Sequence, residues 1–281
     1  DEGIYEDENN LLVLGHRRLS LIDLSHAGHQ PMSYGDGRYW ISYNGELYNY
    51  PEIKEELAKA GFQFTTQSDT EVILAAFAAW GTNAFKRFNG MFAFALWDKE
   101  KAEIYLVRDA SGIKPLYYAV TKQGLAFASE VRGFAPLDYL QEENPDWPVY
   151  LLAYGHLPEP VTTKKHIKPL QKGCFLQYHA KTAEWDIETF KNHHYSENIG
   201  NAGTATEQIA GVLQKAVKRH LISDAPIGVF LSGGLDSSII TRLAGNVHTD
   251  TLKTLSIIFE DKAYSEKKYQ DLLLQKMNCP N

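Results

Sequence analysis

The segment PIGVFLSGGLDSS, residues Pro226–Ser238, decides the fold of the region around it. An apolar run, Ile227–Leu231, stops at Ser232, two glycines follow, and Asp236 opens a stretch of helical composition, IITRLAG. A buried strand that turns through glycines into a helix presents backbone N–H groups at one point, where the helix dipole favours an anion. The Gly-Lys-[Ser/Thr] ending of the common P-loop is missing, so the segment predicts a serine- and glycine-lined cradle for pyrophosphate. An ordinary βα turn with a capping serine is the alternative interpretation.

The neighbouring sequence predicts a βαβ unit around this segment. A helical pattern over Glu207–Leu221 precedes the first strand, a second strand is expected over Leu252–Phe259, and a helix over Glu266–Met277. Strand, helix and strand within about 30 residues require a parallel sheet. We therefore expect an α/β parallel-sheet domain over residues 203–281, incomplete at its end, after a polar linker over Asn192–Ala205.

Strands dominate the first two thirds of the chain, with two amphipathic helices between them. One helix follows Asn49-Tyr50-Pro51 and buries Ile53, Leu57 and Ala60. The other follows the capping-box pattern Ser68-Asp69-Thr70-Glu71 and ends at Gly81. Because helices interrupt runs of strands, the pattern predicts stacked antiparallel sheets with helices outside, an α+β domain. The expected strands are Leu11–Leu14, Tyr39–Tyr43, Met91–Trp97, Glu103–Val107, Leu116–Val120 and Leu125–Ala128.

Composition and charge exclude several classes of protein. The chain of 281 residues has 44% hydrophobic and 22% charged residues, which is typical of soluble globular proteins. A net charge of −7 argues against non-specific nucleic-acid binding, and no apolar stretch nears the length of a membrane span. The two cysteines, Cys174 and Cys279, lack metal-site spacing, so we expect a reducing, cytoplasmic location. A start without methionine leads us to expect a piece of a longer protein.

The stretch SDAPIGVFLSGGLDSS resembles the pyrophosphate loop of ATP-pyrophosphatase ligases, specifically that of glutamine-dependent asparagine synthetases. Upstream motifs resemble the Ntn-type glutamine amidotransferase domain of the same enzymes, in matching order over about 130 residues. The resemblance implies an αββα, Ntn-hydrolase-like glutaminase domain over residues 1–190, followed by the start of a synthetase domain. The upstream motifs are HRRLSLIDLS (His16–Ser25), YNGELYN (Tyr43–Asn49), SDTEVIL (Ser68–Leu74), VRDASGIKPLYY (Val107–Tyr118) and FASE (Phe127–Glu130).

Five residues are expected to bind glutamine, on the basis of this resemblance. Arg18 would grip the α-carboxylate, since a guanidinium matches a carboxylate bidentately; composition alone favours a surface arginine. Asn44 and Gly45, followed by Glu46, would hold the oxyanion of a tetrahedral intermediate, although Asn-Gly alone more often marks a hairpin turn. Asp69 would receive the α-ammonium group; as a lone observation it is an acid that compensates the helix dipole.

The family's nucleophile is an N-terminal cysteine whose own amine serves as the base, and no such residue stands in this sequence. Cys174 and Cys279 lack an adjacent free amine, and Cys174 is expected to be a buried thiol. Either a preceding segment carries the cysteine, or this member has lost glutaminase activity, as the β-lactam-forming relatives did. We expect the former, because the intact glutamine-binding set would have little purpose in an inactive pocket.

The resemblance also implies a nucleotide site in the second domain, for ATP with Mg²⁺. Asp236 would help to position the metal, since adenylyl transfer depends on charge neutralisation. Ile258 and Phe259 would border the adenine, although core packing is the alternative for the ring of Phe259. The residues expected to contact ATP are Leu231, Ser232, Gly233, Gly234, Leu235, Asp236, Ser237, Ser238, Ile258 and Phe259.

The leading hypothesis is therefore a ligase that makes asparagine. Glutamine hydrolysis would supply ammonia to an adenylated aspartate, giving asparagine, glutamate, AMP and pyrophosphate. One alternative is a related amidotransferase or β-lactam-synthetase-like ligase with a different carboxylate acceptor, and another is a non-catalytic sensing module. The expected partners are the small molecules glutamine, aspartate and ATP, without nucleic acid or membrane, and a homodimer is left open.

Overall fold

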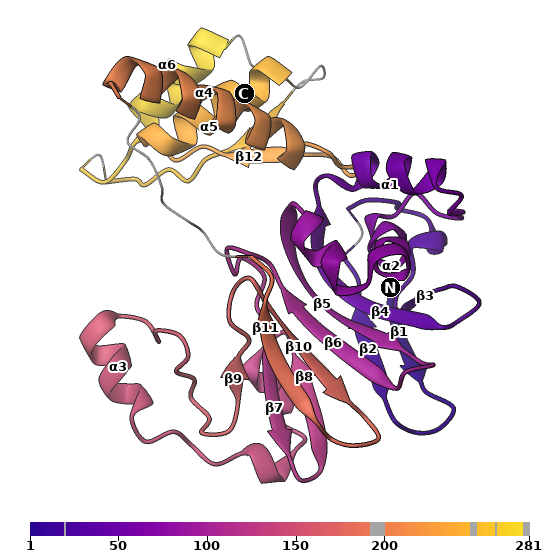
Figure 1. Cartoon of the computed structure of the whole chain (residues 1–281). Helices are drawn as coiled ribbons and strands as arrows, with labels where there is room; N and C mark the ends of the chain where they lie inside the picture. The colour runs from indigo at the N-terminus through magenta and orange to yellow at the C-terminus, as the bar shows by residue number, and fades with distance from the viewer. Residues whose placement is uncertain (20, 192–199, 248–251, 262, 278–281) are drawn as a thin grey trace. The chain divides into compact units, whose positions relative to one another are not determined.

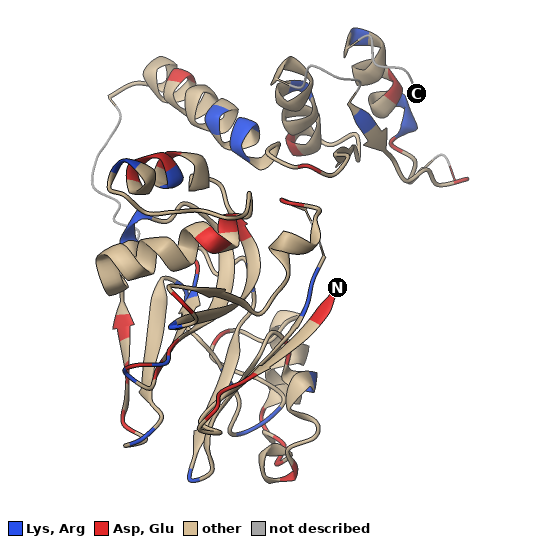
Figure 2. Ribbon diagram, turned by 90° about the vertical axis from the view of Figure 1, so that its right-hand side faces the viewer, with Lys and Arg blue, Asp and Glu red and all other residues tan. Residues whose placement is uncertain are grey.

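The computed structural model describes the whole chain except residues 20, 192–199, 248–251, 262 and 278–281. It divides into two compact units, Asp1–His194 and Tyr195–Asn281, which are treated separately below. Basic and acidic residues are interspersed along the ribbon of the first unit (Figure 2). Within the described residues, no helix has the length and apolar character needed to cross a membrane.

The first unit is built on antiparallel sheets (Figure 1). A six-stranded sheet has the order β11-β10-β6-β5-β4-β3, and every neighbouring pair in it is antiparallel. A three-stranded sheet, β8-β7-β9, and the pair β1-β2 are also antiparallel. The strands are β1 Glu2–Glu6, β2 Val13–Arg17, β3 Met32–Tyr34, β4 Tyr39–Leu47, β5 Gly90–Asp98, β6 Glu103–Arg108, β7 Tyr117–Thr121, β8 Gly124–Ala128, β9 Lys168–Pro169, β10 Cys174–His179 and β11 Trp185–Thr189.

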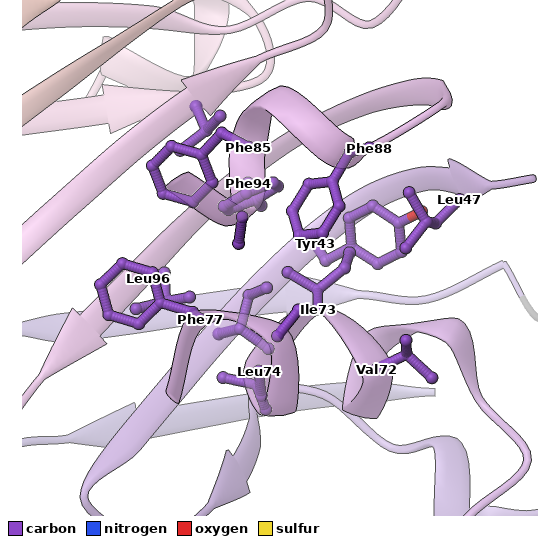
Figure 3. Close-up of a cluster of buried hydrophobic side chains, with 14 of the residues drawn as sticks. Tyr43, Leu47, Val72, Ile73, Leu74, Phe77, Phe85, Phe88, Phe94 and Leu96 are labelled. Atoms are coloured by element: carbon purple, nitrogen blue, oxygen red, sulfur yellow. The ribbon is translucent and has the colours of Figure 1, made fainter. Parts of the chain in front are cut away.

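The six-stranded sheet is covered on both faces. Helices α1 (Tyr50–Lys59) and α2 (Asp69–Trp80) cover one face, where Phe94 and other large side chains form the main core (Figure 3). Because side chains alternate along a strand, the neighbouring Ala93 and Ala95 point to the opposite face. There they pack with residues of β2, β7 and β8 in a second apolar cluster. The observed layers are thus helices, sheet and second sheet, as expected for an α+β domain.

The helix signals in the sequence are largely confirmed. Ile53 and Leu57 of α1 are buried as expected, whereas Ala60 caps the helix and is exposed. Ser68 caps α2 by accepting the N–H of Thr70, but the reciprocal bond of a capping box is absent. Instead, the Glu71 carboxylate accepts hydrogen bonds from the backbone N–H and the hydroxyl of both Thr65 and Thr66.

Several elements of the first unit were not predicted. They include β1, β3 and β11, for which no strand was expected. Helix α3 (Trp147–Tyr154) was not predicted either, and it buries none of its residues. The short helices η1 His26–Gly28, η2 Gly81–Arg87, η3 Val131–Phe134 and η4 Asp138–Leu140 complete the unit.

The second unit contains the predicted parallel pair. Strand β12 (Gly228–Phe230) pairs with β13 (Lys253–Leu255) in parallel, with Val229 opposite Thr254, and α5 (Leu235–Val247) connects them. Helix α4 (Ala202–His220) begins inside the predicted linker, whose residues 192–199 lie outside the described part. Both strands are shorter than predicted, and Phe230 is 78% exposed. Helix α6 spans Lys267–Met277.

Candidate functional site

A cavity of about 470 Å³ opens beside β4 in the first unit. Its walls come from β2 and the loop after it, from β4 and β5, from the start of α2, and from residues 127–130 at the end of β8. The sequence segments that form these walls are up to 115 residues apart, from Gly15 to Glu130, so only the fold brings them together. All five predicted glutamine-binding residues line this cavity: Arg18, Asn44, Gly45, Glu46 and Asp69.

Asn44 and Gly45 lie inside the nine-residue strand β4, so the hairpin-turn interpretation is wrong. Gly45 is required there by close packing rather than by backbone conformation. A Cβ atom at this position would stand 2.2 Å from the carbonyl oxygen of Met91 and 2.7 Å from Cα of Phe92, both in the β5 backbone. A side chain at Gly45 would therefore push β4 away from β5.

Strand β3 pairs only with residues 39–41 of β4, so the rest of that edge of β4 presents backbone N–H donors that no strand of the described residues accepts. The N–H of Tyr43 is bonded to the side chain of Gln30 at 2.7 Å, and the N–H of Leu47 to Asp69 at 2.9 Å. N–H groups two residues apart on a strand point to the same edge. The N–H of Gly45, midway between these two, therefore points to the same edge, and Gly45 lines the cavity.

Asp69 is buried at the start of α2, with 5% of its surface exposed. Its Oδ2 atom accepts the hydroxyl of Tyr43 at 2.8 Å and the N–H of Leu47 at 2.9 Å. Burial raises the pKa of the Asp69 carboxyl, and these two bonds partly oppose that effect. A buried carboxylate fixed by two donors and lining a cavity suits an ammonium group, because an opposite charge compensates its desolvation.

Arg18 lies in the cavity wall with its side chain 6% exposed. Its Nη2 atom donates to the carbonyl oxygens of Ile22, at 3.0 Å, and Asp23, and its Nη1 donates to that of Ser25 at 3.2 Å. Both Nη2 protons are thereby used on the main chain, so the expected bidentate grip is not available in this conformation. One Nη1 proton is left by these bonds, and Nη1 also lies 3.6 Å from a carboxylate oxygen of Asp1, so a bound carboxylate would take the place of this acid. Gly28 permits this arrangement, since a Cβ there would lie 2.2 Å from Nη2.

His16, which the sequence reasoning missed, also lines the cavity. His16 Nδ1 lies 3.1 Å from the Ser42 hydroxyl, which also lies 3.2 Å from the carbonyl oxygen of Gly15. When that hydroxyl donates to Gly15, the protonated Nδ1 of His16 donates to Ser42. Burial, followed by the charge of Arg18, lowers the pKa of His16 to about 4. His16 opens the motif HRRLSLIDLS, two residues before Arg18, and this position was the available signal.

The motif VRDASGIKPLYY supports the cavity rather than reacting in it. Asp109 is fully buried and accepts four backbone N–H groups at 2.9 to 3.2 Å. Arg108 donates to the carbonyls of Gly112 and Lys114 and pairs with Glu159 at 2.7 Å. These bonds fix the loop that places Lys114 in the cavity wall. The donors to Asp109 are the N–H groups of Phe92, Ser111, Ile113 and Lys114.

The predicted pyrophosphate loop of the second unit lies between β12 and α5, as the sequence indicated. The hydroxyls of Ser232 and Ser237 are 2.9 Å apart across the turn, and Ser232 Oγ accepts the N–H of Gly234 at 3.2 Å. Gly233 has a φ of +97°, a left-handed conformation that favours glycine. Asp236 is exposed in the first turn of α5, next to this loop.

Gln270 of α6, also missed from the sequence, fixes the shape of this loop. It is buried, and its Nε2 donates to the carbonyls of Ser232 at 3.0 Å and Ile257 at 3.3 Å, joining the segments that follow the two strands. Ile258 and Phe259 follow β13 and are 55% and 57% exposed, so core packing of the Phe259 ring is not observed. Leu231, in contrast, is buried.

Comparisons with known proteins agree with this two-part arrangement. A glutamine amidotransferase domain model matches residues 1–191, and an asparagine synthase model matches residues 208–281. "Asparagine synthetase [glutamine-hydrolyzing] 1" of Bacillus subtilis (strain 168) is 38% identical over 269 residues, covering 94% of this chain and 41% of that protein. A putative asparagine synthetase of Methanocaldococcus jannaschii is 35% identical over 295 residues, covering 96% of this chain and 55% of that protein.

Among solved structures, glutamine phosphoribosylpyrophosphate amidotransferase from B. subtilis, complexed with ADP and GMP, is 17% identical with a TM-score of 0.47. The match covers 89% of this chain and 52% of the amidotransferase chain. The chain thus spans about two fifths to one half of the length of the curated relatives named above. The resemblance that the sequence motifs carried is confirmed, and over residues 1–191 the chain belongs to the glutamine amidotransferase domain family.

Proposed function

We propose that this chain forms the glutamine-hydrolysing domain, residues 1–190, and the first part of the ATP-binding domain, residues 203–281, of a glutamine-dependent asparagine synthetase. The observation that carries the proposal is the convergence of Arg18, the β4 edge and Asp69 on one cavity. A guanidinium, a row of strand N–H groups and a buried carboxylate match the two charges and the amide of free glutamine. The Ntn-hydrolase-like, αββα architecture belongs to the same proposal.

Recognition of glutamine uses its two charged groups. The α-ammonium group approaches Asp69, whose carboxylate is held by hydrogen bonds from Tyr43 and Leu47. Burial raises the pKa of this carboxyl group. The α-carboxylate approaches the Nη1 atom of Arg18 and replaces the Asp1 carboxylate, which lies 3.6 Å from that atom. Binding requires both charged groups of the ligand, so simple amines and glutamine residues inside peptides are excluded as substrates.

Amide hydrolysis then requires stabilisation of a developing oxyanion. The N–H of Gly45 and the side-chain amide of Asn44 are the donors for it, since both residues line the cavity on one strand. Removing one such oxyanion donor by mutation typically raises the activation free energy by ~3–4 kcal/mol. Glu46, the next residue on β4, contributes to the wall beside the substrate amide.

The second unit is proposed to bind ATP at the loop of Ser232–Ser238. The small serines and glycines allow pyrophosphate to approach the backbone, and the start of α5 favours its charge. The exposed carboxylate of Asp236 offers an oxygen ligand of the kind that Mg²⁺ prefers. When bound, the metal would neutralise phosphate charge during adenylation of the aspartate β-carboxylate. Ile258 and Phe259 are the proposed border of the adenine, where their exposure leaves room for contact.

Calorimetric titration of this chain tests the recognition step. L-glutamine should bind, whereas 4-aminobutanamide, which lacks the carboxylate, and glutaramate, which lacks the amine, should bind at least ~10-fold more weakly. Equal binding of the three compounds would contradict the roles of Arg18 and Asp69.

The synthetase step is tested with the full-length product of the gene. Glutamine, aspartate, ATP and Mg²⁺ together should give asparagine, glutamate, AMP and pyrophosphate in equal amounts, and ammonium should replace glutamine. Absence of AMP with aspartate, but its formation with another carboxylate, would assign a different acceptor.

A further inference from the structure

The side chain of Gln30 extends the hydrogen bonding between β3 and β4 past the first residue of β3, Met32. Met32 pairs with Ile41, so the same register would place residue 30 opposite Tyr43. Strand β3 begins only at Met32, and Pro31 has no N–H to donate. At this point the amide oxygen of Gln30 accepts the Tyr43 N–H at 2.7 Å, in the place of a backbone carbonyl.

Gln30 is buried, with 5% of its surface exposed, and it lines the cavity. Its Nε2 lies 3.5 Å from Oγ1 of Thr70, which is itself 3.0 Å from the capping hydroxyl of Ser68. The contact to Tyr43 is much shorter, so it is the stronger of the two. Gln30 thereby joins the edge of β4 to the first turn of α2, which carries Asp69.

The consequences reach the proposed oxyanion donor. Tyr43 is held by its ring in the core (Figure 3) and by its hydroxyl on Asp69, while its N–H depends on Gln30. If that acceptor is lost, a buried N–H is left unpaired, and the peptide must turn to find a partner. Gly45 is two residues further along the same edge, so such a turn changes the direction of its N–H.

We propose that Gln30 is a positioning residue for amide hydrolysis: its side-chain amide replaces the missing strand and fixes the direction of the Gly45 N–H. The inference rests on the proposed glutaminase function. Gln30 touches no reacting atom in this role, so it should affect the rate of the chemical step more than the binding of glutamine.

The test uses Gln30→Met in the full-length protein, because methionine has a similar shape but offers no comparable acceptor. The kcat for glutamine hydrolysis should fall ~10- to 100-fold, as expected for a misplaced donor, with KM changed less than ~3-fold. Gln30→Glu keeps an oxygen acceptor and should recover part of the rate. Gln123→Met, at an exposed turn position, is the matched control and should leave kcat unchanged. Ammonium-dependent asparagine synthesis, which bypasses this site, should be unchanged in every variant.

Hydrogen exchange of the Tyr43 amide gives a second readout, and it should be faster in Gln30→Met than in the control. If Gln30→Met does not fold, Gln30→Asn takes its place, since its amide is one methylene too short to reach Tyr43. A folded variant with kcat within ~2-fold of the parent and unchanged exchange would overturn the role of Gln30 and leave the proposed function intact. A parent protein that neither binds nor hydrolyses glutamine would overturn both.

Discussion

Replacement of Gly45 by alanine tests how closely β4 must approach β5 at the site. The new Cβ would lie 2.2 Å from the Met91 carbonyl oxygen, against an ordinary contact distance of 3.4 Å. The strands must therefore separate by about 1.2 Å at this point, which neither backbone can absorb without losing ladder bonds. Two weakened backbone bonds at ~1 kcal/mol each, with the strain of overpacking, give a loss of about 2 to 4 kcal/mol.

The assay has a stability arm and an activity arm. For a domain of this size the loss corresponds to a fall in Tm of roughly 4 to 16 °C, measured by calorimetry. Gly15→Ala is the matched stability control, because a Cβ added at Gly15 would have no atom within 4 Å and the backbone there is not left-handed. Glutamine hydrolysis should fall ~100-fold through displacement of the Gly45 N–H, while ammonium-dependent synthesis persists. A Tm equal to that of Gly15→Ala, or an unchanged kcat, would refute the reasoning.

Three further predictions concern charged groups. Asp69→Asn should weaken glutamine binding ~30-fold or more in calorimetric titration, since truncating one partner of a buried charge pair costs ~2–5 kcal/mol. Asp186→Asn, at an exposed position, is the control. A change in glutamine affinity below ~3-fold in Asp69→Asn would contradict the assignment. Because the pKa of His16 is about 4 in the folded chain and 6.5 ordinarily, the unfolded state binds the proton first. Stability should therefore fall as pH drops from 6.5 to 4, by about 1–2 kcal/mol after allowing for partial exposure. His16→Gln should lose this component in urea titrations, and an identical pH profile would disprove it. Asp236→Ala should slow Mg²⁺-dependent pyrophosphate release ~100-fold and leave glutamine hydrolysis intact, so equal loss of both activities would point to misfolding instead.

Local signals in the sequence were sufficient for the elements that depend on neighbouring residues. The cap at Ser68, the apolar stripe of α1 and the strand–glycine–helix turn before α5 all have their causes within a few residues. Motif resemblance added Asn44 and Gly45, which local reasoning alone would have assigned to a hairpin. That error has a physical origin, because the close approach of β5 that requires Gly45 involves residues more than forty positions away.

The sequence by itself determined most of the helices and longer strands, the family, and the residue types available to bind an amino acid and a nucleotide. Only the tertiary structure decided that Arg18 donates both Nη2 protons to its own loop, that burial lowers the pKa of His16, and that Gln30 completes the edge of β4. Each of these depends on hydrogen bonds or burial that other segments of the chain supply. Such contacts leave no periodic trace in the sequence, since one glutamine or histidine among polar neighbours looks the same in a buried site as on the surface.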